Sequence, residues 1–349
     1  LNRAGVPLME LVTEPDITSG AQARAFCQKI QQIFRYLNIS DADMEKGQMR
    51  CEVNISLYKD GADRLSGQKV EVKNLSSFKV VEQAIDYEIA RQTKALDAGE
   101  NIAQETRGWD DKKCKTVSQR KKENANDYRY FPEPDIPPMT FSEEYIAQLR
   151  RTLPELPEQK VVRFVEEYGV RRESCEVLTA DKDTADFFEH VVSEINDKKQ
   201  SGEMKAEAKK AVTLAANYII NELQQLLAAE DAKIATMRIS AENFAELIGI
   251  VADGVINSSA AQTVLHEMYH GDDDDPSHII DAKNLAQVSD TGALQEIIDA
   301  VVQNNAQSVA DYQSGKENAI KYLMGQVMKE SKGKANPQMV MELLKEKLQ

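Results

Sequence analysis

The sequence has 349 residues, of which 42% are hydrophobic and 29% charged, and its formal net charge is −15 at pH 7. This length exceeds what one compact core usually holds, so we expect two or three domains. No apolar stretch is long enough to span a membrane, and the acidic balance argues against a protein that binds DNA or RNA through its overall charge.

The sequence has two parts that differ in their predicted secondary structure. Residues 1–145 mix short alternating segments, helical segments and many Gly and Pro turns, whereas nearly every later periodic segment is helical. This division predicts an α+β fold. We expect a mixed or antiparallel sheet domain over 1–145, an all-α helical domain over 146–280, and a small all-α tail domain over 281–349.

In chain order, residues 7–13 have the pattern of a strand. A helix capped by Ser19 then extends to about Leu37, and a second helix runs from Phe78 to about Asp97. The Pro-rich residues 132–138 cannot continue a helix or a central strand, so we expect an extended surface segment.

The later part of the sequence predicts clear helices at 203–227, 241–253 and 259–270. The acidic run 271–276 follows, and like charges repel, so we expect a solvated, extended linker there. The last 67 or so residues predict a bundle of three or four short helices, broken at Gly, Asn and Pro positions.

The most informative segment is residues 49–57, in which the odd positions are apolar and the even positions polar. This period of two is typical of a half-buried strand. Residues 69–74 alternate in the same way. If the two strands pair as a hairpin, one polar face carries the carboxylates of Glu52 and Glu71, bracketed by the cations of Arg50 and Lys73.

Such a face has a chemical use. Mg2+ prefers oxygen ligands and often takes one or two carboxylates together with phosphate oxygens and water. Arg and Lys side chains neutralise the remaining phosphate charge, and a helix that begins at Ser76 or Ser77 adds backbone donors for an anion. The alternative is a solvated sheet face with ordinary cross-strand ion pairs.

Two polar and aromatic clusters, residues 105–110 and 127–131, carry further candidate anion contacts in Arg107 and Arg129. Surface ion pairing is the alternative for each. The pattern from His266 to His270 matches His-Glu-x-x-His, which would place two metal ligands on one helix face. Gly271 and the acidic run end that helix at once, so we interpret these residues as an exposed helix end.

The four cysteines are widely spaced and form no CxxC pair: Cys27, Cys51, Cys114 and Cys175. This argues against a zinc cluster in the sequence and favours a reducing compartment, so we expect a cytoplasmic protein. The first five residues do not resemble a signal peptide, and we expect the chain to begin within a longer protein. Residues 316–349 hold seven Lys and four Glu, a local basic patch that could contact an RNA backbone or only complement helix dipoles.

Five segments, in order within the first 135 residues, resemble signature segments of the B subunit of tRNA-dependent amidotransferases. They are residues 2–16, 49–57, 71–78, 105–110 and 127–135. The remainder resembles the helical domain of that subunit and its YqeY-like tail, so the resemblance covers essentially the whole chain.

The resemblance implies a glutamine-hydrolysing carbon–nitrogen ligase that works with two companions, an amidase (the A subunit) and a small protein (the C subunit). The amidase releases ammonia, and the B subunit uses ATP and Mg2+ to phosphorylate the side-chain carboxylate of misacylated Glu-tRNA(Gln) or Asp-tRNA(Asn). Ammonia then displaces phosphate and gives Gln-tRNA or Asn-tRNA. We expect the helical and tail domains to hold the tRNA, and no DNA or membrane partner.

Residue by residue, the resemblance implies that Glu52 and Glu71 are the catalytic, metal-binding carboxylates. Some members have Asp at the position of Glu52. Arg50, Lys73 and Arg107 are the implied phosphate contacts. The family's N-terminal segment, which has Glu-x-His metal ligands and in many members zinc-binding cysteines, is not in this sequence. We therefore expect Zn2+ only in that segment, and no turnover by this chain alone.

Two other functions fit the same residues. One is a non-catalytic adaptor that docks tRNA and whose sheet face is only solvated. The other is an unrelated ATP-dependent ligase that activates an acyl group. The resemblance leaves Gln-tRNA, Asn-tRNA or both as the product.

Overall fold

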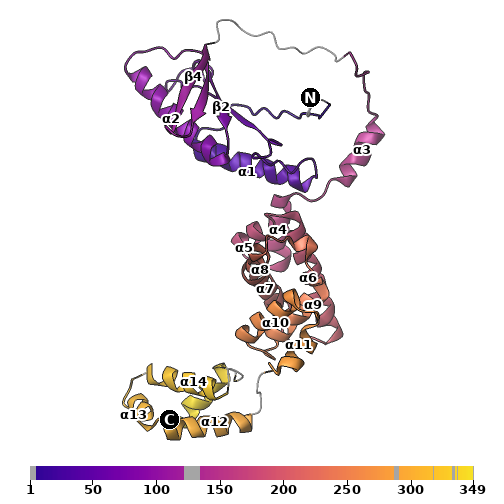
Figure 1. The fold of residues 1–349 in the computed structure, drawn as a ribbon, viewed down its shortest axis with the longest axis vertical. Coiled ribbons are helices and arrows are strands. Elements are labelled where there is room, and N and C mark those ends of the chain that lie inside the picture. The colour runs from indigo at the N-terminus through magenta and orange to yellow at the C-terminus, as the bar shows by residue number, and fades with distance from the viewer. Residues whose placement is uncertain are drawn as a thin grey trace. The chain divides into compact units, whose positions relative to one another are not determined.

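A computed structural model of the chain describes residues 5–121, 134–286, 291–316, 318–331, 335 and 337–348. The chain divides into two compact units, Leu1–Leu156 and Pro157–Gln349. The first unit combines a sheet with helices and the second is helical (Figure 1). The predicted α+β fold class is therefore confirmed.

The sheet of the first unit has four strands in the order β1-β2-β3-β4. β1, Cys51–Ile55, pairs antiparallel with β2, Val70–Leu75, so the predicted hairpin forms. β2 pairs parallel with β3, Glu105–Asp110, and β3 pairs antiparallel with β4, Lys115–Lys121. The sheet is thus mixed, as predicted.

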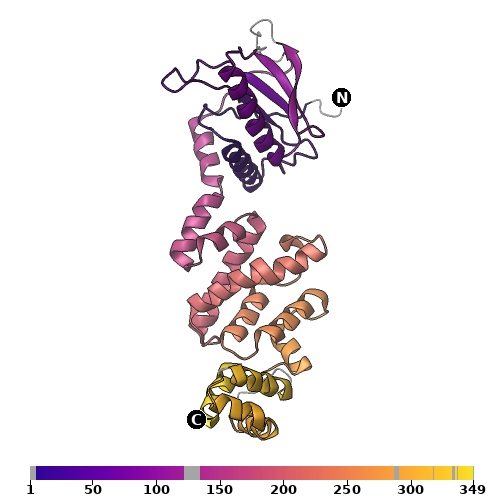
Figure 2. The same ribbon diagram turned by 90° about the vertical axis from the view of Figure 1, so that its left-hand side faces the viewer.

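The parallel pair β2–β3 is joined by a crossover helix, because two parallel neighbours cannot be connected by a tight turn. This helix, α2, spans Phe78–Asp97 and begins at Ser77, whose hydroxyl accepts a hydrogen bond from the Val80 amide. Apolar residues of α2 share one core with Val70 and Val72 of β2. Figure 2 shows α2 lying along one face of the sheet.

The first helix of the unit, α1, spans Gly20–Tyr36 and packs beside α2. Its N-cap is Ser19, whose hydroxyl accepts a hydrogen bond from the amide of Gln22. Both helices predicted before residue 100 are therefore confirmed. A last helix of this unit, α3, spans Glu143–Thr152.

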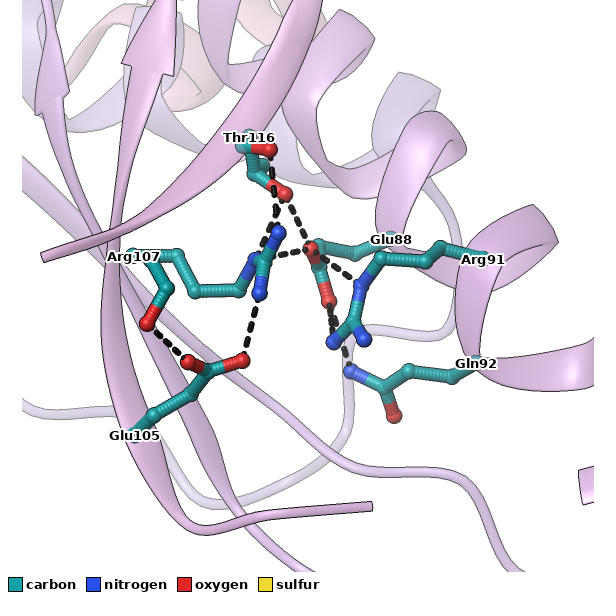
Figure 3. Close-up of polar contacts among 7 residues, drawn as sticks. Glu88, Arg91, Gln92, Glu105, Arg107 and Thr116 are labelled. Carbon is teal, nitrogen blue, oxygen red and sulfur yellow. Dashed lines mark hydrogen bonds and ion pairs between the residues drawn. The ribbon is translucent and has the colours of Figure 1, made fainter. Parts of the chain in front are cut away.

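A buried polar cluster joins α2 to β3 and β4 (Figure 3). The Arg107 guanidinium of β3 donates to the Thr116 hydroxyl at 2.8 Å and lies 3.2 Å from a carboxylate oxygen of Glu88 on α2. The same guanidinium pairs with Glu105 at 2.5 Å. Arg91 and Gln92 of α2 also donate to Glu88.

The charges of this cluster balance, because two carboxylates meet two guanidinium groups. Burial alone would raise the pKa of Glu88, but hydrogen bonds from Arg91, Thr116 and Gln92 outweigh it and hold that pKa below its ordinary value. The Glu88 side chain is 0% exposed. Removing one member of so buried a set leaves its partners uncompensated.

The second unit is helical throughout its described part. Its first hydrophobic cluster is built from helices between residues 157 and 283. These are α4 Pro157–Tyr168, α5 Arg172–Leu178, α6 Lys182–Ser201, α7 Ala208–Tyr218, the π-helix Ile219–Leu223, α8 Gln224–Ala229, the short 3-10 helix Ile234–Thr236, α9 Ala241–Ala252, α10 Ser258–His270 and α11 Pro276–Lys283. The three helices predicted in this part are confirmed, with a π-helical turn inside the first.

A separate hydrophobic cluster lies near the C-terminus. It is formed by α12 Thr291–Asn304, α13 Ala306–Gln313, α14 Asn318–Glu330 and α15 Pro337–Leu348. This confirms the predicted bundle of short helices. Among the helices of the described part, none is both long and apolar enough to cross a bilayer.

Two local predictions were wrong. Residues 7–13 form no strand, because no described segment pairs with them, and Leu8 remains 92% exposed. The acidic run 271–276 is not an extended linker, since its carbonyl groups at Gly271 and Asp272 accept hydrogen bonds from Arg238. Asp275 then caps α11.

Two of the four cysteines meet between α1 and β1. The thiol sulfurs of Cys27 and Cys51 lie 3.7 Å apart, and both residues are half-buried. The hydrogen bond from Cys51 lowers the pKa of Cys27, whereas the same contact and burial raise the pKa of Cys51. Their separation in sequence gave no sign of this pairing.

The buried cluster predicts a pH-dependent stability. Glu88→Gln should lower the free energy of unfolding by about 3 kcal/mol at pH 7, the scale for breaking a buried ion pair. Since the pKa of Glu88 is depressed in the folded chain, its contribution is complete above its ordinary pKa of 4.5 and is lost as pH falls through the lower folded value. Denaturant unfolding of both forms across this pH range measures the difference.

Glu82→Gln on the same helix is the matched control, because Glu82 forms only a partly exposed ion pair with Arg24. It should cost at most about 1 kcal/mol. Equal losses in the two variants, or a Glu88→Gln difference that persists in acid, would contradict the proposed role of the buried charge.

The contact of α1 with β1 predicts a specific cross-link. Diamide, which accepts two hydrogen atoms from a thiol pair, should join Cys27 to Cys51, because their sulfurs need only move from 3.7 Å to the disulfide length of about 2.05 Å. Peptide mapping by mass spectrometry identifies the product. Cys27→Ser should abolish it, and Cys114→Ser should not; formation of other pairs instead would refute the packing of α1 on β1.

Candidate functional site

The face of the sheet opposite α2 carries the candidate residues. Val70 and Val72 of β2 are buried toward the helices, so Glu71 and Lys73, which alternate with them, point to the other face. Asn54 of β1 lies directly across from Glu71 in the register. The structure therefore brings together the polar residues of both predicted strands.

A bulge in β2 sets the position of Lys73. Cys51 pairs with Leu75 and Val53 with Val72, so two residues of β2 lie opposite one residue of β1. The bulge includes Asn74, whose φ of 61° is left-handed, a conformation that Asn tolerates better than most residues. Both Lys73 and Asn74 thus lie opposite Glu52.

The Lys73 ammonium lies between the two predicted carboxylates. Its Nζ is 3.4 Å from Glu52 Oε2 and 3.3 Å from Glu71 Oε1. The two glutamates therefore face a common point, as the hairpin predicts. A single cation offsets the repulsion between them, which would otherwise oppose holding two carboxylates on one face.

The charge on Lys73 is stabilised by this arrangement. Partial burial lowers the pKa of the amine, but the hydrogen bond to Glu71 and the charges of Glu52 and Glu71 outweigh it, so that the pKa is raised. The group therefore remains an ammonium at neutral pH. A positive charge beside two carboxylates suits a site that receives both a metal ion and phosphate oxygens.

The two carboxylates differ in their surroundings. The Glu52 side chain is 49% exposed and that of Glu71 only 17%. Thr106, which lies beside Glu71 in the parallel register, donates its hydroxyl hydrogen to Glu71 Oε2 at 2.8 Å. Glu71 is thus held by side chains from two strands, whereas the more exposed Glu52 has more freedom to turn.

The other predicted contacts lie in different places. Arg50 is exposed and directly precedes β1, on the side of Glu52 by alternation. Arg107 belongs to the buried cluster with Glu88, on the face that packs against α2, and only 13% of its side chain is exposed. The structure does not bring it to Glu52 and Glu71. A phosphate contact by Arg107 stays a prediction, and it would require exchange of these bonds.

Several weaker candidates are also placed. Ser77 uses its hydroxyl to cap α2, and Arg129 lies outside the described residues. His266 and His270 lie on α10 with ring centroids 4.3 Å apart, and His270 faces Glu230. In the tail, Lys316 pairs with Asp311, whereas Lys332 and Lys334 lie outside the described residues.

The donor set of the sheet face fits a magnesium ion. Glu52 and Glu71 supply two carboxylates, and Mg2+ characteristically completes its shell with water and phosphate oxygens instead of an all-protein cage. Within the part of the chain that the structure describes, no group of three His, Cys, Asp or Glu residues is arranged to hold a metal. Two carboxylates with an adjacent ammonium therefore suit a metal that arrives with a nucleotide.

Sequence reasoning missed Thr106 and the buried cluster around Glu88. The segment 105–110 was identified only as a polar and aromatic cluster, and its partner strands were not predicted. The signal that was available is the period of two within it, which sets Thr106 and Arg107 on opposite faces. Without the parallel pairing to β2, nothing in the sequence connects Thr106 with Glu71.

Comparison with known protein families finds two matching domains. Residues 1–147 match the family described as the GatB/GatE catalytic domain, and residues 186–348 match the one described as the GatB domain. The first match contains all five predicted site residues.

Curated relatives match along the whole chain. A protein of Persephonella marina is 44% identical over 348 residues, which are 100% of this chain and 70% of that protein. A protein of Dehalococcoides mccartyi strain 195 is 42% identical over 351 residues, again 100% and 70%. One of Thermotoga maritima is 40% identical over 349 residues, 100% and 69%. Each is named as the B subunit of aspartyl/glutamyl-tRNA(Asn/Gln) amidotransferase. The chain therefore belongs to the family of aspartyl/glutamyl-tRNA amidotransferase B subunits.

Proposed function

We propose that this chain carries a main part of the site at which an amidotransferase activates the side-chain carboxylate of Glu-tRNA(Gln) or Asp-tRNA(Asn). The enzyme would be a glutamine-hydrolysing carbon–nitrogen ligase. The observation that supports this most is the Lys73 ammonium between Glu52 and Glu71 on one polar sheet face.

The chemistry explains why such a face is useful. A carboxylate is a poor acyl electrophile until one of its oxygens becomes a good leaving group. ATP, bound with Mg2+, would supply the phosphoryl group that makes it one and leave as ADP, and ammonia would then displace phosphate to give the amide. Catalysis of phosphoryl transfer consists largely of positioning and of neutralising charge.

The residues would divide these tasks. Glu52 and Glu71 would hold Mg2+, and Lys73, with Arg50 beside β1, would contact phosphate oxygens. Arg107 is the least direct of the predicted phosphate contacts, because its guanidinium is already engaged by Glu88 and Glu105. With Glu52 and Glu71 engaged as metal ligands, the Lys73 ammonium would be free to turn from the carboxylates toward the transferred group.

The partners follow from the same reaction. Ammonia must come from a protein that hydrolyses glutamine, and we propose the amidase and the small C subunit of the amidotransferase as the companions of this chain in the cytoplasm. The tRNA body would rest on the helical and tail parts, and the local basic patch of residues 316–349 would contact its phosphate backbone although the whole chain is acidic.

An adaptor that only docks tRNA is the competing function. Glu52→Gln and Glu71→Gln distinguish the two, because each removes one charge from a metal-binding pair without changing the side-chain size. In the complete complex, each variant should lower ATP-dependent activation of Glu-tRNA(Gln) by about 10–100-fold or more, while glutamine hydrolysis is less affected. Release of ADP and formation of Gln-tRNA are the quantities to measure.

Glu100→Gln is a suitable control, since Glu100 is exposed after α2 and lies outside the proposed site. It should leave both reactions unchanged. Full activity in Glu52→Gln and Glu71→Gln would favour the adaptor. ATP hydrolysis that responds to free glutamate, and not to misacylated tRNA, would instead indicate an unrelated acyl-activating ligase.

A further inference from the structure

The two faces of β3 carry two different sets of polar contacts, which are made by the adjacent residues Thr106 and Arg107. On the face toward α2, Arg107 is bound by Glu88, Glu105 and Thr116 (Figure 3). On the opposite face, Thr106 is bound to Glu71. Adjacent residues of a strand point in opposite directions, so the Thr106 bond lies on the face of the candidate site and the Arg107 cluster lies on the face toward α2.

The Glu71 carboxylate is held by each of its oxygens. Oε2 accepts the hydrogen bond of the Thr106 hydroxyl at 2.8 Å, and Oε1 faces the Lys73 ammonium at 3.3 Å. Thr106 is only 8% exposed, so water has little access to compete for this bond. The hydroxyl therefore fixes the plane of the carboxylate, and Oε1 is the oxygen presented to a cation.

We propose that Thr106 is the positioning residue for the Glu71 carboxylate, because its hydroxyl holds Oε2 and leaves Oε1 to face a cation. This inference rests on the proposed function, in which Glu71 binds Mg2+. A neighbour that orients a metal ligand typically changes metal affinity by about 10–100-fold when it is removed.

The arrangement explains why a threonine occupies this position. A β-branched residue suits a strand. Its apolar methyl group can be buried without the loss of a hydrogen bond, and its hydroxyl reaches the neighbouring strand. The parallel register places Thr106 directly beside Glu71, so the hydroxyl and the carboxylate lie on neighbouring strands within hydrogen-bonding distance. Valine would keep the shape and remove only the donor.

The test compares Thr106→Val and Thr106→Ser in the complex of the full-length protein with its partner subunits. Binding of Mn2+, followed by electron paramagnetic resonance, is the first readout, and the Mg2+ concentration for half-maximal activation is the second. Thr106→Val should weaken Mn2+ binding and raise the half-maximal Mg2+ concentration about tenfold or more. Thr106→Ser, which keeps the hydroxyl, should stay near the parent.

Thr116→Val is the matched control, because it also removes a buried threonine hydroxyl from this sheet. Thr116 is 2% exposed and bonds to Glu88 on the face toward α2. This variant should lower the unfolding temperature without changing Mn2+ affinity. If Thr116→Val and Thr106→Val weakened Mn2+ binding equally, the cause would be a general loss of sheet stability, and the proposal would be overturned.

Two other results would also overturn it, and they differ from each other. If Glu71→Gln weakens Mn2+ binding but Thr106→Val does not, Glu71 is a ligand that needs no positioning, and only the role of Thr106 is lost. If Glu71→Gln itself binds Mn2+ like the parent, the assignment of Glu71 in the proposed function fails, and the inference about Thr106 fails with it.

Discussion

The parallel pairing of β2 with β3 is the constraint on which the candidate site depends. Parallel neighbours require a crossover connection, and that connection is α2, which covers one face of the sheet and supplies Glu88. The opposite face is left to polar residues of β1 and β2. One topological feature therefore produces both the buried cluster beneath the sheet and the carboxylates above it.

Much of the first unit followed from local patterns. Alternating residues identified β1 and β2, and serine caps marked the starts of α1 and α2, because each signal involves residues close together in sequence. The same alternation placed Glu52 and Glu71 on one face. The helices of the second unit could also be predicted from the sequence, since their apolar residues recur with the period of a helix.

The rest depended on contacts between distant segments. β4 contains a single strongly apolar residue, Val117, so its sequence gives little indication of a strand. The direction of Arg107 could be decided only once β3 was known to face α2. The strand predicted at residues 7–13 failed for the related reason that an apolar pattern does not form a strand without a partner to pair with.

The bulge at Asn74 also determines which changes of chain length the hairpin can accept without a change in the pairing of β1 and β2. A β-bulge pins the register of the strands beside it, because the extra residue cannot move along the ladder without breaking pairs. The long connection between β1 and β2 can therefore change in length without altering which side chains lie opposite one another. Insertions in that connection would therefore leave the spacing of the two glutamates unchanged, whereas deletion of Asn74 would remove the bulge and leave Lys73 as the only residue opposite Glu52.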